Sequence, residues 1–153
     1  MTLETELQAF ETPSLRMQAQ LLVSFQAPED EAERILEELT KIVPLTYGNY
    51  DRCALRSAAG IEHYRPLEGA ASGAEEKVRM RPGVVQVSFL IPRDHALLEQ
   101  AVDQIFAVHC YEEPVIMVQE VLASLSKGRS DKENPHRWWN TSGDWMKRAE
   151  TVS

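Results

Sequence analysis

The fold of this chain is decided by one stretch, Val84-Val85-Gln86-Val87-Ser88-Phe89-Leu90-Ile91-Pro92. It is rich in β-branched and apolar residues, which favour a strand. An amphipathic run at residues 94–108 follows, with apolar residues at helical spacing, and a second β-rich run occupies residues 115–122. The sequence therefore predicts a strand–helix–strand unit.

The start of this unit repeats a pattern found earlier in the chain. The matching residues, at a constant offset, are Val23-Ser24-Phe25 with Pro28 and Asp30, and Val87-Ser88-Phe89 with Pro92 and Asp94. In the earlier copy, we expect a strand at residues 20–26 and a helix that starts near residue 32 and is closed by Pro44. Such a repeat indicates two related halves of one domain.

The segment between the two halves predicts a hairpin and a loop. Residues 48–57 enter a strand, the small residues 57–60 reverse the chain, and residues 61–65 form the return strand. Residues 67–82 are small, charged and aperiodic, which predicts an exposed loop. Two β-α-β units that share one antiparallel sheet, with both helices on one face, form the ferredoxin-like sandwich, here an α+β fold with an extra hairpin.

The predicted sheet has more apolar positions than its helix layer can cover. Val85, Val87 and Phe89 alternate with Gln86, Ser88 and Leu90 on one strand, and the last strand adds a further set, Val115, Met117, Val121 and Leu122. An uncovered apolar sheet face implies a partner subunit.

Composition and charge exclude several classes of protein. The 153 residues are 43% hydrophobic, which is enough for one domain with a core. A net charge of −8 disfavours a nucleic-acid partner, because such binding depends on many Lys and Arg contacts. The acidic start and the lack of an apolar run of about 20 residues predict a cytoplasmic protein with no membrane partner. Cys53 and Cys110 lack the spacing of a disulfide framework, and we expect reduced thiols.

Three ordered motifs resemble a known family. They are Gly48-Asn49-Tyr50-Asp51-x-Cys53, Tyr64-Arg65-Pro66-Leu67-Glu68-Gly69-Ala70 and His109-x-Tyr111-Glu112-Glu113. Together they resemble the domain inserted in the bacterial Nif-three-like (YqfO) proteins, which is itself similar to CutA and the PII signalling proteins. The resemblance covers roughly residues 20–122 and implies a ferredoxin-like fold and a homotrimer that packs sheet to sheet.

The chain also departs from this family. Cys110 stands where the family has proline, Pro114 follows the Glu pair, and Ala71-Ser72 replaces Asn-Pro. Nif-three-like proteins hold a two-metal site in lobes that flank the insert, and this chain has no room for those lobes. PII-type proteins bind nucleotides between subunits, but no Walker-type phosphate loop occurs here.

Two groups of candidate site residues emerge from the motifs. As ligand-binding or intersubunit residues we predict Tyr50, Asp51, Tyr111, Glu112 and Glu113. As ligands of a divalent metal ion we consider His109, Cys110, His63 and Cys53. An adjacent His and Cys seldom chelate one ion comfortably, and we favour the alternative that His109 and Tyr111 cap the helix end. No catalytic residues can be assigned, so we expect a protein that is not an enzyme, with a divalent metal ion as the one cofactor left open.

The C-terminal tail is not explained by the family. It holds all three tryptophans of the chain, Trp138, Trp139 and Trp145. Since leaving large aromatic rings in water is unfavourable, we expect the tail to dock on its own trimer, with an external protein as the alternative. We divide the chain into an N-terminal extension (1–19), the ferredoxin-like domain (20–124) and the tail (125–153).

These expectations combine into one functional hypothesis and one alternative. The first is a non-catalytic, regulatory CutA/PII-like trimer that binds a small ligand or a divalent metal ion in clefts between its subunits. The alternative is a structural or protein-interaction trimer that uses the tryptophan-rich tail and takes no small molecule.

Overall fold

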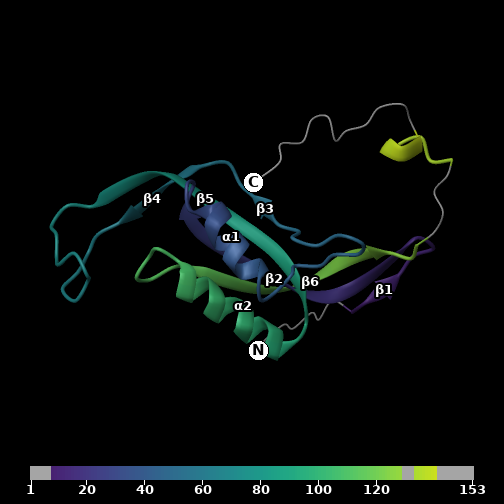
Figure 1. Ribbon diagram of the computed structural model, residues 1–153, viewed down its shortest axis with the longest axis horizontal. Coiled ribbons are helices and arrows are strands. Elements are labelled where there is room, and N and C mark those ends of the chain that lie inside the picture. The colour runs from purple at the N-terminus through teal and green to yellow at the C-terminus, as the bar shows by residue number, and fades with distance from the viewer. Residues whose placement is uncertain (1–7, 129–132, 141–153) are drawn as a thin grey trace, which may run out of the picture.

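The strand–helix–strand pattern occurs twice in the computed structural model, which describes residues 8–128 and 133–140 of the 153-residue chain (Figure 1). The first half holds β1 (Phe10–Glu11), β2 (Leu15–Pro28) and α1 (Ala32–Thr40). A middle segment with β3 (Leu55–Arg56) and β4 (Gly60–Tyr64) leads to the second half, which holds β5 (Arg79–Pro92), α2 (His95–Val108) and β6 (Ile116–Ser126). A short 3-10 helix, η1 (Trp138–Asn140), lies in the tail.

The strands form one six-stranded sheet in which β2 is central. β2 pairs antiparallel with β5 on one side and with β6 on the other. The two copies of the sequence repeat lie side by side, because Ser24 of β2 pairs with Ser88 of β5 and their hydroxyl oxygens are 3.0 Å apart. The predicted α+β ferredoxin-like fold is confirmed, and the repeat is the pairing of its two halves.

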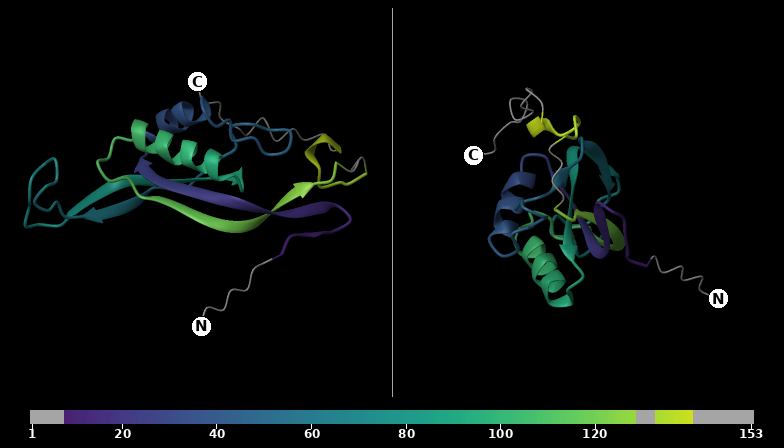
Figure 2. Two further views of the ribbon diagram at one scale, coloured as in Figure 1. Left: turned by 90° about the horizontal axis from the view of Figure 1, so that it is seen from below. Right: turned by 90° about the vertical axis from the view of Figure 1, so that its right-hand side faces the viewer.

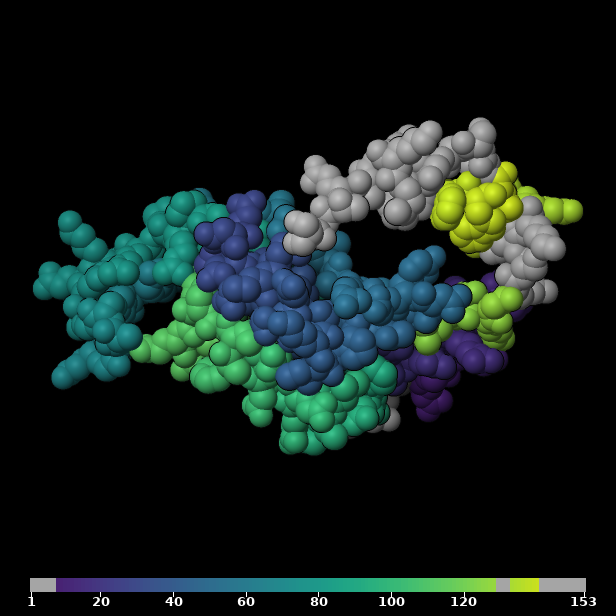
Figure 3. Space-filling model, in the orientation of Figure 1, coloured from purple at the N-terminus to yellow at the C-terminus, as the bar shows by residue number. Residues whose placement is uncertain are grey.

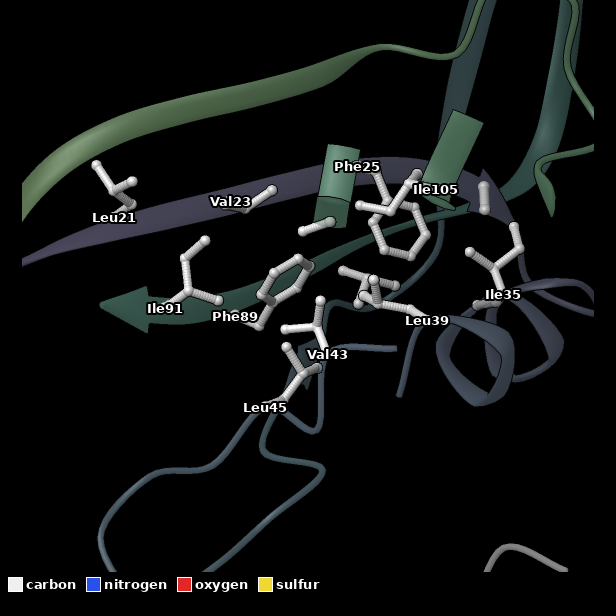
Figure 4. Packing of buried hydrophobic residues seen from close by; sticks show 14 of the residues in the cluster. Leu21, Val23, Phe25, Ile35, Leu39, Val43, Leu45, Phe89, Ile91 and Ile105 are labelled. Atoms are coloured by element: carbon white, nitrogen blue, oxygen red, sulfur yellow. The ribbon is translucent and has the colours of Figure 1, made fainter. Parts of the chain in front are cut away.

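Both helices cover the same face of the sheet, as Figure 2 shows from two further directions. Alternate residues of β2 and β5 point toward them, so that Val23 and Phe25 are fully buried, with Phe89 almost as deep. On the helix side, these side chains pack in one cluster with Ile35 and Leu39 of α1 and Ile105 of α2 (Figure 4). Among the residues described, neither helix is long and apolar enough to cross a lipid bilayer.

The helix ends show where local sequence decides the structure. The Asp94 side chain caps α2 by accepting hydrogen bonds from the amides of Ala96 and Leu97, at 3.0 and 3.3 Å. α1 ends at Thr40, earlier than the predicted end at Pro44, and Ile42, which falls within the predicted helix, is 48% exposed. Val43 still enters the core, but from the loop that follows the helix.

The predicted hairpin at residues 57–60 is wrong. β3 and β4 both pair antiparallel with β5, so they run in the same direction along one edge of the sheet. The chain between them therefore forms a bulge in that edge and does not reverse its direction. Ser57 connects this bulge to β5: its amide donates to the Gln86 carbonyl (2.9 Å) and its hydroxyl accepts from the Gln86 amide (2.8 Å). Small residues permit a bulge as readily as a turn, and the long-range pairing with β5 selects the bulge.

The reversal occurs instead between β4 and β5, over residues 65–78. The predicted loop at residues 67–82 is therefore wrong in its last part, because β5 begins at Arg79 and pairs with β4 there. The strands and their connecting loop form a long hairpin that projects from one end of the molecule, drawn in teal in Figures 1 and 3. We call this element the β4–β5 hairpin.

The sheet face away from the helices is uncharged rather than apolar over its central part, with Arg16 nearer the start of β2. Within residues 20–26 of β2, 86–90 of β5 and 117–121 of β6, the cross-strand register places ten residues on it: Gln20, Leu22, Ser24, Gln26, Gln86, Ser88, Leu90, Met117, Gln119 and Val121. We call these residues the open face. Of the apolar set predicted for it, Met117 and Val121 lie there, while Leu122 pairs with Ala19 on the helix side. The helix side also takes the side chains of Val85, Val87 and Phe89, which are buried. The open face therefore has fewer apolar residues than the sequence predicted.

Candidate functional site

A cleft of about 560 Å³ lies where the β4–β5 hairpin meets the turn after α2. Both elements lie at the same end of the molecule, with the turn drawn in green (Figures 1 and 2). The lining includes Gln26 from β2, and the other residues are Glu62, His63, Tyr64, Pro66, Ala70, Ala71, Ser72, Arg79, Arg81, Cys110, Tyr111, Glu112, Glu113 and Val115. Three of the predicted ligand-binding residues, Tyr111, Glu112 and Glu113, therefore meet in one cleft.

His109 positions the turn against the sheet. It is the C-terminal cap of α2, and its amide donates to the Ile105 carbonyl at 3.0 Å. Its ring Nδ1 accepts from the Tyr111 amide at 2.9 Å, so Nε2 carries the proton and donates to the Gln26 carbonyl at 2.6 Å. Both ring nitrogens are thus engaged, which is the structural role that the sequence favoured.

Arg81 lies over two tyrosine rings inside the cleft. Its guanidinium carbon is 5.2 Å from the ring centre of Tyr64 and 4.8 Å from that of Tyr111, both within cation–π range. It also donates a hydrogen bond to the Tyr64 hydroxyl at 2.9 Å. We call Tyr64, Arg81 and Tyr111 the Arg81 stack.

The charge of Arg79, the neighbouring arginine, is neutralised. Arg79 forms an ion pair with Glu75 and a 3.3 Å hydrogen bond to the Tyr64 hydroxyl. For Arg81, no carboxylate of the described ranges lies within ion-pair distance. Arg81 is therefore a cation in the cleft whose charge is not matched by a carboxylate partner.

The two tyrosines of the stack differ in their electrostatics. Hydrogen bonds from Arg79, and more weakly from Arg81, lower the pKa of the exposed Tyr64 hydroxyl. Burial raises the pKa of Tyr111, and the nearby Arg81 guanidinium offsets this only in part. The Tyr111 hydroxyl is buried beside the Arg81 guanidinium, which can donate only toward its oxygen, and within residues 8–128 and 133–140 no group accepts its proton. It is a neutral donor with an unused proton.

The predicted metal ligands are not assembled as a metal site. His63 and Cys110 line the cleft, but Cys53 does not, and the ring nitrogens of His109 are both occupied. Across the part of the chain that the structure describes, no three His, Cys, Asp or Glu side chains are grouped so that they could hold a metal ion. Cys110 is exposed, and partial desolvation, followed by the nearby Glu31 carboxylate, raises the pKa of its thiol.

Tyr50 and Asp51 do not reach the cleft. Their loop is held by Tyr47, whose hydroxyl donates to the Ser124 carbonyl. Ser124 is near the far end of β6, roughly 26 Å from the first residue of that strand at the usual rise per residue. Asp51 forms a 2.8 Å ion pair with Arg52, and Tyr50 is 70% exposed.

The tail is described only in part. Trp138 and Trp139 pack edge to face with ring centres 6.0 Å apart, and they remain 42% and 55% exposed. Trp145 lies outside the described residues. The docking of these three residues stays a prediction, as do the three domain boundaries.

Comparison with known proteins identifies the fold of this chain. No protein-family model matches the sequence, and no curated protein matches it. The structure is similar to a Bacillus cereus protein related to NIF3, with a TM-score of 0.58 and 21% identity over 71% of this chain and 27% of that one. It is also similar to the divalent ion tolerance protein CutA1 from Ehrlichia chaffeensis, with a TM-score of 0.50 and 18% identity over 74% of this chain and 86% of that one.

This chain has a CutA-like fold. The family resemblance is therefore confirmed for the fold, and at these identities the comparison shows the fold alone. The chain spans 27% of the length of the NIF3-related protein, and nearly the whole CutA1 chain is covered. The CutA-like fold positions the cleft but does not identify its occupant.

The two arginines of the cleft in this CutA-like fold were missed by sequence reasoning. Arg79 and Arg81 fall in the segment that was expected to be a loop. Their spacing of two, ahead of the β-rich run, was a signal of a strand with both guanidinium groups on one face. Tyr64 was read only as part of a motif.

Glu112 links the turn to the hairpin across the CutA-like fold. Its carboxylate accepts the Ala71 amide at 2.9 Å. Glu112→Ala removes this acceptor, so we expect faster hydrogen exchange at the Ala71 amide, by about fivefold or more. Glu113→Ala is the matched control, because Glu113 lines the same cleft in the next position. Equal exchange in both variants would show that the Glu112 contact does not hold the loop.

Proposed function

We propose that this chain is a non-catalytic regulatory module that assembles as a homotrimer and binds a small ligand in the cleft between the β4–β5 hairpin and the turn after α2. The observation that carries the proposal is the Arg81 stack, a cation without a carboxylate partner among the described residues, set in a cleft of about 560 Å³. A cleft of this size lies within the range of small-molecule sites.

The open face supports self-association. All ten of its residues are uncharged, and depletion of charge is typical of the buried centre of an interface. Its glutamines and serines can hydrogen-bond across copies of the chain, while Leu22, Leu90 and Met117 supply apolar contact. The family resemblance implies a trimer, and this face is where the copies would meet.

The chemistry of the cleft supports binding rather than catalysis. Nucleophilic catalysis needs an activated group with a base beside it. Cys110 is exposed, partial desolvation raises the pKa of its thiol, and both nitrogens of His109 are used in hydrogen bonds that hold the turn, so that this imidazole is not free to act as a base beside it. Cys53 and Cys110 are free thiols, which agrees with a reducing, cytoplasmic compartment.

Two measurements on the full chain test this function. Light scattering at micromolar concentration is expected to show three times the protomer mass of 17.4 kDa. A thermal-shift panel of divalent metal salts, nucleotides and small carboxylates is expected to raise the melting temperature with at least one compound. The CutA1 comparison, a divalent ion tolerance protein, is the reason to include metals. A stable monomer, or no shift with any compound, would contradict the proposal.

The exposed tryptophan pair favours one second candidate. Trp138 and Trp139 present a half-exposed aromatic surface of the kind found at interface centres. In this alternative the trimer is a protein-interaction module that needs no small molecule. Loss of a co-purifying protein in the Trp138→Ala, Trp139→Ala variant, with an unchanged trimer and no ligand-induced shift, would favour it.

A further inference from the structure

We infer that the cleft binds the oxyanion of a small molecule, a carboxylate or a phosphate group, on the guanidinium of Arg81 with the Tyr111 hydroxyl as a second donor. This inference rests on the proposed function, in which the cleft is the ligand site. It adds the chemical class of the ligand and the residues that recognise it.

Arg81 is prepared for this role by its surroundings. A guanidinium carries five N–H donors in a rigid fork, and a hydrogen bond to the Tyr64 hydroxyl together with the adjacent Tyr111 side chain fixes its orientation and leaves donors over. The guanidinium carbon lies over both tyrosine rings, and guanidinium N–H groups point outward in their own plane, so further hydrogen bonds are made at its edge. A carboxylate or phosphate matches that edge with two parallel bonds. Arg79 does not compete, because Glu75 neutralises it.

The Tyr111 hydroxyl points to the same class of ligand. A buried hydroxyl donor without an acceptor is unfavourable, and the Tyr111 proton has no acceptor in the described part of the chain, since the neighbouring guanidinium only donates. Tyr111 lines the cleft and lies beside Arg81. An oxyanion held by Arg81 can accept this second hydrogen bond, which neither an apolar ligand nor a cation can do.

The rest of the lining limits what else the ligand carries. Pro66, Ala70 and Val115 provide apolar wall for its body. Glu62 and Glu113 also line the cleft, and they disfavour a ligand with several negative charges. The class that fits is a small molecule with one oxyanion group and hydrogen-bond donors elsewhere, such as an amino acid or a phosphate monoester with an amino group.

The test uses the full chain with three probes: inorganic phosphate, acetate and glycine. Each is titrated at constant ionic strength, set with sodium chloride, while NMR follows the Arg81 Nε–H and the backbone amides of Ala71 and Tyr111. We expect saturable shifts with at least one oxyanion. Saturation with phosphate alone identifies a phosphate site, and saturation with acetate or glycine identifies a carboxylate site.

Variants locate the binding. Arg81→Gln is expected to weaken binding at least about tenfold, and Tyr111→Phe several-fold, each measured at the backbone amides. Arg81→Lys keeps the charge but loses the fork, so its loss should be intermediate, and it also controls for folding of the hairpin. Arg93→Gln removes the same charge from a residue paired with Glu120 outside the cleft and should leave binding unchanged.

Two outcomes would overturn the inference. The first is that the NMR chemical shifts change linearly with concentration, without saturation, for all three probes. The second is that the Arg81→Gln and Arg93→Gln variants bind the probe equally. If the chain is a trimer that a metal salt stabilises while no oxyanion binds, the inference fails and the proposed function stands. If the chain is a monomer that no compound stabilises, the proposed function fails as well.

Discussion

Phe25→Ala is expected to lower the free energy of unfolding by about 3–5 kcal/mol, the usual range for a buried phenylalanine. Phe25 is fully buried in the second half of β2, beneath Ile105 and near Leu39 (Figure 4). Its removal leaves a cavity between the sheet and both helices, which the rigid strand pairing on either side cannot close. Denaturant titration followed by far-UV circular dichroism measures the change.

Phe106→Ala is the matched control. Phe106 lies on α2 next to the buried Ile105, but it is 56% exposed. The same substitution there should change the free energy of unfolding by no more than about 1 kcal/mol. Both variants must be compared at one protomer concentration, because self-association adds to apparent stability. Similar losses in the two variants would mean that α1 and α2 do not cover the sheet as described.

Met117→Glu is expected to convert the proposed trimer to monomers. Met117 lies on the open face, and association through this face would bring one new carboxylate from each copy into a buried, uncharged interface. Burying an unpaired charge is strongly unfavourable, and like charges in one site repel each other. Light scattering at micromolar concentration should then report the protomer mass of 17.4 kDa.

Val118→Glu separates the effect of the face from that of the charge. Val118 is the next residue of β6 and lies on the other side of the sheet, and both side chains are 42% exposed in the protomer. The Val118→Glu variant should keep the wild-type mass. If both variants dissociate, or if neither does, the open face is not the interface and the copies meet elsewhere.

Much of the fold could be predicted from the chain because its signals are local. The alternation in residues 84–92 and its copy at Val23-Ser24-Phe25 identify the two central strands, and Asp94 marks the start of α2. Three cleft residues, Tyr111, Glu112 and Glu113, were also found from a motif. These patterns depend on neighbours a few residues apart, and such neighbours are visible in a sequence.

The errors occur where distant residues decide the outcome. Small residues at 57–60 suit a turn, but pairing with β5 makes them a bulge in one edge of the sheet. The charged residues after position 75 are typical of a loop, but pairing with β4 makes residues from Arg79 onward part of β5. Tyr50 and Asp51 occupy a junction equivalent to that of Tyr111 in sequence, but the antiparallel sheet places the two junctions at opposite ends.

The sequence by itself determined the doubled β-α-β plan, the two apolar helix stripes and the Asp94 helix cap. Only the tertiary structure decided that the open face is uncharged, that the hairpin turns at residues 65–78, and that Arg81 lies over Tyr64 and Tyr111. The physical reason is range. Periodicity and capping act within a few residues, whereas cross-strand register and cation–π contacts join residues whose separation along the chain does not reveal their distance in space.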